Sequence, residues 1–160
     1  MKKAGRLLRV AAAVGGLVTA GCDGFVGVIA VSPNGVVLVV IDPPVVTGQS
    51  YTGSGCPGYA ASMANFQLGI RSPSEDLSIQ SVTMRFRDAF GAAGSPITYS
   101  SSEILRSAGD PVVPRGGSRN LGFSVPYGCS PPNPTSLSAH VTMVSRSGAT
   151  VESEAVASIR

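Results

Sequence analysis

Tryptophan is absent from this sequence of 160 residues, histidine occurs once, and lysine occurs only at positions 2 and 3. One histidine and three cysteines offer too few ligands to favour a zinc site. The chain has no lysine beyond position 3 for a Walker-type loop, no G-x-G-x-x-G motif after a predicted strand, and no G-x-S-x-G motif. These absences argue against nucleotide-binding proteins and serine hydrolases of the kinds that such motifs identify.

Charged residues are also scarce, at 13% of the chain, whereas glycine (20 residues) and proline (12 residues) are abundant. Serine, threonine and valine are frequent as well. Valine and threonine favour strands, while glycine, proline and serine favour tight turns. The composition therefore predicts short strands joined by turns rather than helices.

The first 21 residues have the pattern of an export signal. Four basic residues come first, and an uncharged apolar run over residues 10–20 follows them. The basic residues are Lys2, Lys3, Arg6 and Arg9. This order is typical of a secretory signal peptide, and the apolar run is too short to cross the ~30 Å hydrocarbon layer of a bilayer as a helix.

Removal of this leader leaves 139 residues, enough for one domain with its own core. The leader holds four of the twelve basic residues, so eight basic residues remain against nine acidic ones. The formal charge of +3 thereby falls to about −1, which leaves no basic surface for nucleic acid.

The small pair Ala20 and Gly21 directly before Cys22 resembles the lipobox of bacterial lipoproteins. The resemblance implies a diacylglycerol on the Cys22 sulfur, cleavage before Cys22 and acylation of the new amine. It also implies a protein of the bacterial cell envelope that is anchored in a membrane and faces the periplasm or the cell exterior. Ordinary signal cleavage after Ala20, with release of a soluble protein, is the alternative.

Cys56 and Cys129 remain once Cys22 carries the lipid. Export places them in an oxidising compartment, where we expect them to form a disulfide. A bridge that closes so long a loop stabilises the fold by roughly 4 kcal/mol in the chain-entropy model. The alternative is that both are free thiols buried as small apolar side chains.

The first part of the mature chain predicts a hairpin followed by a loop. Residues 25–31 and 36–41 flank a turn at residues 32–35 that contains Pro33 and Gly35. Residues 36–41 are apolar at every position, which predicts a strand covered on both faces. Residues 45–64 are rich in glycine and are predicted to form a loop.

Alternating apolar residues then predict several strands with one face in the core. The inward sets are Phe66, Leu68 and Ile70; Val82, Met84 and Phe86; Leu121, Phe123 and Val125, ended by Pro126; Leu137, Ala139, Val141 and Met143; and Val151, Ala155, Ala157 and Ile159. Leu77 and Ile79 are out of phase with Val82, which predicts a bulge near Gln80 and Ser81.

Local motifs complete the expected fold. A short strand is expected over residues 96–99, and Ser100 with Glu103 forms a capping-box pattern for one helical turn that Gly109 would end. A register that pairs Met143 with Val151 leaves a three-residue hairpin loop at 146–148 and sets His140 opposite Glu154.

About seven such strands predict an all-β protein built as a two-sheet antiparallel sandwich. The layout resembles immunoglobulin-like and fibronectin-type-III-like domains, and the resemblance covers residues 36–160. The expected organisation is a signal peptide (1–21), an anchor and hairpin arm (22–35) and the sandwich (36–160). In such a fold the loop before Phe66 and the loop after Val125 emerge at one pole, so the disulfide between Cys56 and Cys129 would join them.

No catalytic, metal or cofactor site is predicted. His140 has Glu154 across the strand pair and Ser138 and Thr142 on the same face, but neighbours on an exposed strand face form no oxyanion hole. We therefore interpret His140 and Glu154 as a solvent-facing pair. Acidic residues in the loops are interpreted as turn and cap residues rather than calcium ligands; they are Glu75, Asp76, Asp88 and Asp110.

Tyrosines near the cysteines allow two readings. Tyr51, Tyr59 and Tyr127 either form a binding patch at the loop pole or cover the disulfide and shield the core; shielding is favoured.

The function expected from the whole sequence is a lipid-anchored, non-enzymatic interaction or structural module of the envelope. Its partners would be the membrane, through Cys22, and another envelope protein or a glycan. The alternative is a secreted β-sandwich that binds a small ligand or glycan.

Overall fold

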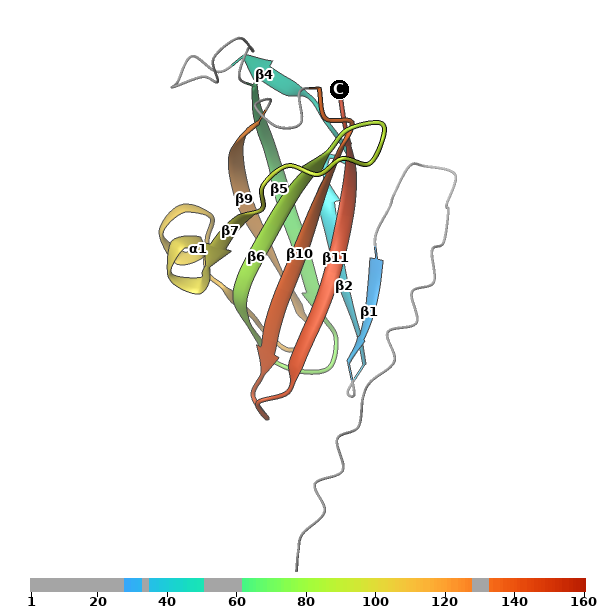
Figure 1. The fold of residues 1–160 in the computed structure, drawn as a ribbon. Helices are drawn as coiled ribbons and strands as arrows, with labels where there is room; N and C mark the ends of the chain where they lie inside the picture. The colour runs from blue at the N-terminus through green and yellow to red at the C-terminus, as the bar shows by residue number, and fades with distance from the viewer. Residues whose placement is uncertain (1–27, 33–34, 51–61, 128–132) are drawn as a thin grey trace, which may run out of the picture.

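The structure is a computed structural model, and it describes residues 28–32, 35–50, 62–127 and 133–160. Within these ranges the chain forms eleven strands and one helix, and the strands belong to two sheets that pack face to face (Figure 1). The expectation of an all-β, two-sheet protein is confirmed. Cys22, Cys56 and Cys129 lie outside the described residues, as do Tyr51 and Tyr59.

One sheet has five strands. Its strands are β1 (Val28–Ser32), β2 (Gly35–Asp42), β4 (Gly48–Ser50), β5 (Ser62–Ser72) and β9 (Gly117–Tyr127). β5 is central, since it pairs with β9 on one side and with β2 and then β4 on the other. β1 extends the sheet beyond β2, with Ser32 opposite Gly35 as the predicted hairpin requires.

The other sheet has six strands. They are β3 (Val45–Val46), β6 (Leu77–Arg87), β7 (Ile97–Ser100), β8 (Val112–Val113), β10 (Ser136–Ser145) and β11 (Thr150–Ile159). The pairs β6–β10 and β10–β11 run antiparallel and form the middle of the sheet. Short strands β3, β7 and β8 border them.

The core lies between the sheets and is built from the predicted inward-facing positions. Period-two alternation sends one set of side chains of each strand inward, because successive residues of a strand point to opposite faces. Leu68 and Met143, for example, are completely buried, one from each sheet. Phe66 and Phe123 stack across neighbouring strands with ring centroids 5.8 Å apart.

Three local predictions are confirmed. Thr142 pairs with Ser81 and Met143 with Ile79, so Gln80 is the extra residue of a bulge in β6. Met143 pairs with Val151 in the final hairpin, and Gly148 has a positive φ of 84° in the loop between β10 and β11. Glycine adopts this conformation without steric cost, which is why it suits the third loop position.

The helix α1 (Ser101–Ser107) begins at the predicted capping box. The carboxylate of Glu103 accepts hydrogen bonds from the Ser100 backbone N–H (2.8 Å) and from the Ser100 hydroxyl (2.6 Å). Ile104 is the buried residue of the helix and holds it against the core. Gly109, with φ of 135°, follows the helix end as predicted.

The structure corrects two predictions about residues 36–64. β2 is buried on one face only: Val36 and Leu38 are 44% and 38% exposed, while Val37 and Val39 are buried. An unbroken apolar run therefore does not imply cover on both faces here, because only the inner face meets the opposite sheet. Residues 45–64 are not all loop, since β3 and β4 lie there and β5 begins at Ser62.

Two further differences concern strand ends and direction. β9 runs through Pro126 to Tyr127; β9 pairs only with β5 among the described strands, and an edge strand tolerates the missing N–H of proline. The β3–β11 pair is parallel, so the fold is not wholly antiparallel. The chain leaves β2 at Pro43 and Pro44, and Val45 and Val46 then lie beside the end of β11.

Candidate functional site

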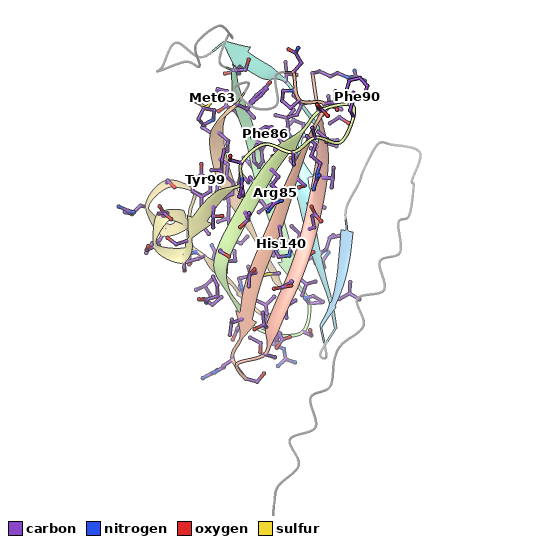
Figure 2. All side chains as sticks on the ribbon, viewed as in Figure 1. Met63, Arg85, Phe86, Phe90, Tyr99 and His140 are labelled. Carbon is purple, nitrogen blue, oxygen red and sulfur yellow. The ribbon has the colours of Figure 1, made fainter. Side chains whose placement is uncertain are left out.

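The outer face of the six-stranded sheet is polar over its three central strands. Its residues come from alternate positions of β6, β10 and β11, which point away from the core. They are Thr83, Arg85 and Arg87 on β6; Ser138, His140 and Thr142 on β10; and Glu152 and Glu154 on β11. Arg85 and His140 are marked on this face in Figure 2.

A shallow, open hollow of about 300 Å³ lies on this face. It is lined by Thr83, Arg85, Arg87, Ser138, His140 and Glu154. Strand pairing explains the grouping, because Ser138 is opposite Arg85 and His140 lies between Thr83 and Glu154. The hollow thus combines two guanidinium groups, one imidazole, two hydroxyls and one carboxylate.

His140 pairs with Glu154 across the strands, as predicted. The acidic side chain that it contacts, however, is that of Glu152, the diagonal neighbour on β11. The Nε2 atom of His140 lies 3.9 Å from Oε2 of Glu152, and the two side chains are 43% and 59% exposed. A pair this exposed contributes under ~1 kcal/mol. Among the described residues, no hydrogen bond joins His140 to Ser138 or Thr142, so the arrangement is that of a solvent-facing pair.

The two arginines of the hollow are almost free of protein partners. Arg87 donates one hydrogen bond from Nη1 to the carbonyl of Gly91, at 3.3 Å. Arg85 is exposed and forms no hydrogen bond or ion pair with any residue in the described part of the chain. Since each guanidinium carries five N–H donors, most of this donor capacity faces solvent.

The hollow was not predicted from the sequence. The alternation of β6 was a sufficient signal for the common direction of Arg85 and Arg87, with Phe86 buried between them. The contribution of Ser138, His140 and Glu154 depends on which strands become neighbours. That information lies in the pairing of β6 with β10 and of β10 with β11.

Tyr127 is the member of the predicted tyrosine patch that the structure describes. Its ring stacks on Phe86 with centroids 4.9 Å apart and an interplanar angle of 17°. Burial raises the pKa of Tyr127, and a hydrogen bond with Ser62 partly offsets the rise. Its hydroxyl also lies over Gly48. Tyr127 therefore packs against the edge of the core.

Tyr99 also packs instead of standing free. It lies on β7, and its ring centroid is 5.2 Å from that of Phe123. Burial, followed by the nearby carboxylate of Glu103, raises the pKa of Tyr99. Phe90 is the opposite case, since it is 97% exposed in the turn after β6, where Figure 2 shows it at the periphery.

Three of the four acidic loop residues organise the backbone. Asp88 Oδ1 accepts hydrogen bonds from the N–H groups of Phe90 and Ala92, both at 2.9 Å, and Asp76 Oδ1 accepts one from Arg115 N–H at 2.8 Å. These are the turn roles that the sequence predicts. In the part of the chain that the structure describes, no group of three or more His, Cys, Asp or Glu residues is placed to hold a metal ion.

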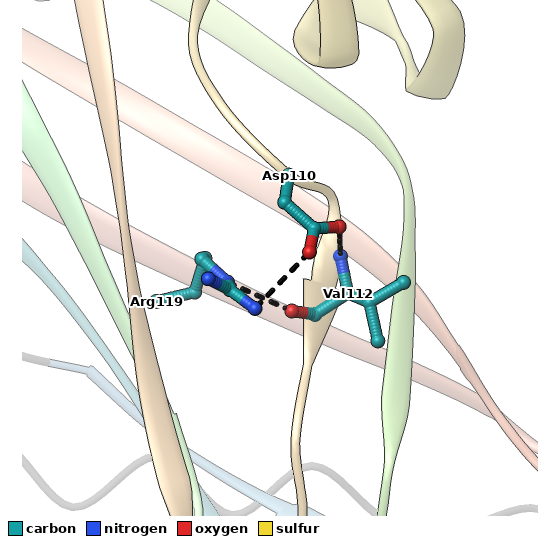
Figure 3. Close-up of polar contacts among 3 residues, drawn as sticks. All are labelled: Asp110, Val112 and Arg119. Carbon is teal, nitrogen blue, oxygen red and sulfur yellow. Dashed lines mark hydrogen bonds and ion pairs between the residues drawn. The ribbon is translucent and has the colours of Figure 1, made fainter.

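Asp110 forms the most connected of these polar groups (Figure 3). Its Oδ1 atom accepts a hydrogen bond from the Val112 N–H at 2.9 Å, and its Oδ2 atom lies 3.1 Å from Nη2 of Arg119. Arg119 Nε donates to the Val112 carbonyl at 2.9 Å. Together these bonds join β8 to β9.

Comparison with known proteins identifies no family. No protein-family model matches the chain, and no curated protein matches it either. One solved structure, described as the X-ray structure of Northeast Structural Genomics Consortium target SoR45, is similar with a TM-score of 0.47 and 14% identity. The similarity covers 76% of this chain and 82% of that one.

The described part of the chain contains no helix that is long and apolar enough to cross a membrane.

Proposed function

We propose that this protein is a lipid-anchored, non-enzymatic interaction module of the bacterial cell envelope, with an immunoglobulin-like sandwich as its folded part. The observation that carries the interaction role is the exposed polar face of β6, β10 and β11. Arg85 lies on it without a partner among the described residues. A guanidinium held in a fixed strand position with its donors unused is suited to recognise another molecule.

The strand order supports the immunoglobulin-like assignment. β2, β5 and β9 are consecutive neighbours in one sheet, and β6, β10 and β11 are consecutive neighbours in the other. This division matches the first, second and fifth strands of such a sandwich against its third, sixth and seventh strands.

The start of β1 supports a short connection between a lipid on Cys22 and the sandwich. Val28 begins β1 and pairs with Val39, and Cys22 precedes it by six residues. Six residues span at most ~20 Å, so a lipid on Cys22 would hold the sandwich close to the membrane. Several acyl chains give stable attachment, since each buried CH₂ adds ~0.8 kcal/mol.

Membrane fractionation of the full chain expressed in a bacterium tests the anchor. We expect the wild-type protein in the membrane fraction, with an intact mass that corresponds to acylated Cys22 as the first residue. Cys22→Ser should move the protein to the soluble fraction or leave the signal peptide uncleaved. Cys56→Ser is the matched control, since it removes a cysteine but should leave membrane attachment intact. A Cys22→Ser protein that has lost its leader and still partitions with the membrane, or a native species that begins at Met1, would contradict the proposal.

A secreted binding module is the second candidate, and small residues before the alternative cleavage site after Ala20 favour it. The same mass measurement separates the two, because this product would begin at Gly21 and carry no lipid.

A further inference from the structure

The hollow on the six-stranded sheet has a charge pattern that is complementary to an anion. Arg85 and Arg87 both line it from alternate positions of β6, and Glu154 lines it from β11. Two guanidinium groups and one carboxylate line the hollow, while Glu152, the other acidic residue of this face, lies two residues away on β11, opposite Thr142. The residues opposite the arginines on β10 are Ser138 and Ser136, so the neighbouring strand supplies no acidic partner.

Like charges on one strand face repel each other, and an acidic residue across the strand pair is the usual compensation. Here the acidic residues are on β11, two strands away from β6. Glu152 interacts with His140, and no ion pair joins Glu154 to Arg85 or Arg87 within the described residues. An anionic ligand between the arginines would therefore provide the missing compensation.

The other lining groups select for hydroxyls beside the anion. Thr83, Ser138 and His140 can donate and accept hydrogen bonds, and the Glu154 carboxylate accepts them. A sugar ring presents several hydroxyls that can pair with these donors and acceptors, and a ligand with one carboxylate and several hydroxyls therefore matches the lining better than a ligand with carboxylates alone. The carboxylate of Glu154 also disfavours a dianionic phosphate relative to a singly charged ligand.

We propose that this hollow binds a carboxylate-bearing sugar residue of an acidic glycan. Arg85 and Arg87 bind the sugar carboxylate, and Thr83, Ser138, His140 and Glu154 bind ring hydroxyls. The volume of about 300 Å³ is at the lower end of the range for ligand sites, which suits one sugar ring. The assignment rests on the proposed role as an interaction module and adds the ligand class to it.

His140 provides a direct reporter, because it is the only histidine in the chain and its ring protons give one set of NMR signals. The full chain, purified in detergent without a histidine tag, is titrated with D-glucuronate up to about 50 mM, since weak sites of this size bind in the millimolar range. Parallel titrations use D-glucose, acetate and inorganic phosphate. We expect a saturable shift of the His140 signals with glucuronate and much weaker effects of the other three.

Arg85→Gln should weaken glucuronate binding about tenfold or more, because it removes the charged donor while keeping a polar side chain. Arg71→Gln is the matched control, since Arg71 is an exposed strand arginine of the other sheet, and it should leave binding unchanged. Circular dichroism and the melting temperature verify that both variants are folded.

Several results would overturn the proposal. These are no saturable shift with glucuronate, equal binding of glucose or acetate, binding of phosphate as tight as that of glucuronate, and an equal loss of affinity in Arg71→Gln. Each leaves the fractionation and mass results for Cys22 standing, because those measurements do not involve the hollow. Failure of the anchor would in turn leave the sugar titration interpretable.

Discussion

Ser62 and Tyr127 are Cα partners at the last rung of the β5–β9 pair. The chain reaches Ser62 from Cys56, six residues earlier, and leaves Tyr127 toward Cys129, two residues later. The two segments that lead to the cysteines therefore leave the sheet at neighbouring residues. Six extended residues reach ~20 Å, so the pairing of β5 with β9 permits the disulfide, which stays a prediction.

The first prediction concerns this disulfide. In the native protein, Cys56 and Cys129 should resist alkylation under denaturing conditions unless a reductant is present. Cys56→Ser should make Cys129 reactive and lower the free energy of unfolding by about 4 kcal/mol. Mass spectrometry of the alkylated protein and chemical denaturation provide the measurements. Alkylation of both residues in denaturant without a reductant would show that they are free thiols.

The second prediction concerns the packing of Tyr127. Gly48→Ala places a methyl group against the Tyr127 hydroxyl, so the ring must move from its stack on Phe86. We expect a loss of about 1–3 kcal/mol in the free energy of unfolding, as for other overpacked sites.

Gly122→Ala is the matched control, because its added Cβ would meet no atom within 4 Å. This variant should stay within about 0.5 kcal/mol of wild type. A spectrophotometric titration adds a second measurement: loss of burial in Gly48→Ala should bring the raised pKa of Tyr127 back toward its ordinary value. Equal stability of the two variants would show that the Tyr127 ring can move without cost.

The third prediction concerns the pH dependence of the capping box. Hydrogen bonds from the Ser100 hydroxyl and then the Ser100 backbone N–H lower the pKa of Glu103 below its ordinary value of 4.5. The folded state therefore binds this proton less readily than the unfolded state. Its contribution to stability is complete above the unfolded-state pKa and is lost as the pH falls through the lowered folded-state pKa.

Compared with Glu103→Gln, the wild-type protein should thus be more stable at neutral pH, and the difference should vanish in acid. Denaturation curves at several pH values measure it. Ser100→Ala removes the largest cause of the shift and should reduce the pH dependence, while costing about 1 kcal/mol through the lost cap. A difference between wild type and Glu103→Gln that grows in acid would contradict this account.

The fourth prediction concerns the junction of β8 with β9. Lysine cannot reproduce the two donors with which Arg119 binds Val112 and Asp110, so Arg119→Lys should lower the free energy of unfolding. The side chains of Arg119 and Asp110 are 34% and 50% exposed, so the expected loss is at most about 1 kcal/mol. In Arg115→Lys the hydrogen bond to Asp76 persists, since it uses the backbone N–H, and stability should not change. Equal free energies of unfolding for the two variants would show that the Arg119 contacts do not contribute measurably to stability.

Parts of the fold that depend on neighbouring residues could be predicted from the sequence. The hairpin between β10 and β11 is one example: its register follows from alternation and from the glycine at position 148. The bulge at Gln80 is another, since it follows from the phase change between Ile79 and Val82. β3 and β4 were missed because strands of two and three residues are too short to display a period.

The candidate site could be predicted only in part, for a related reason. The sequence by itself determined that Arg85, Arg87, His140 and Glu154 point away from the core, because side chains alternate along a strand whatever its partners are. Only the tertiary structure decided that these residues line one hollow, because their neighbourhood depends on the pairing of β6 with β10 and of β10 with β11. It also decided that one face of β2 is exposed. The six-stranded sheet packs against the other face of β2, and no second layer covers the outer one among the described residues.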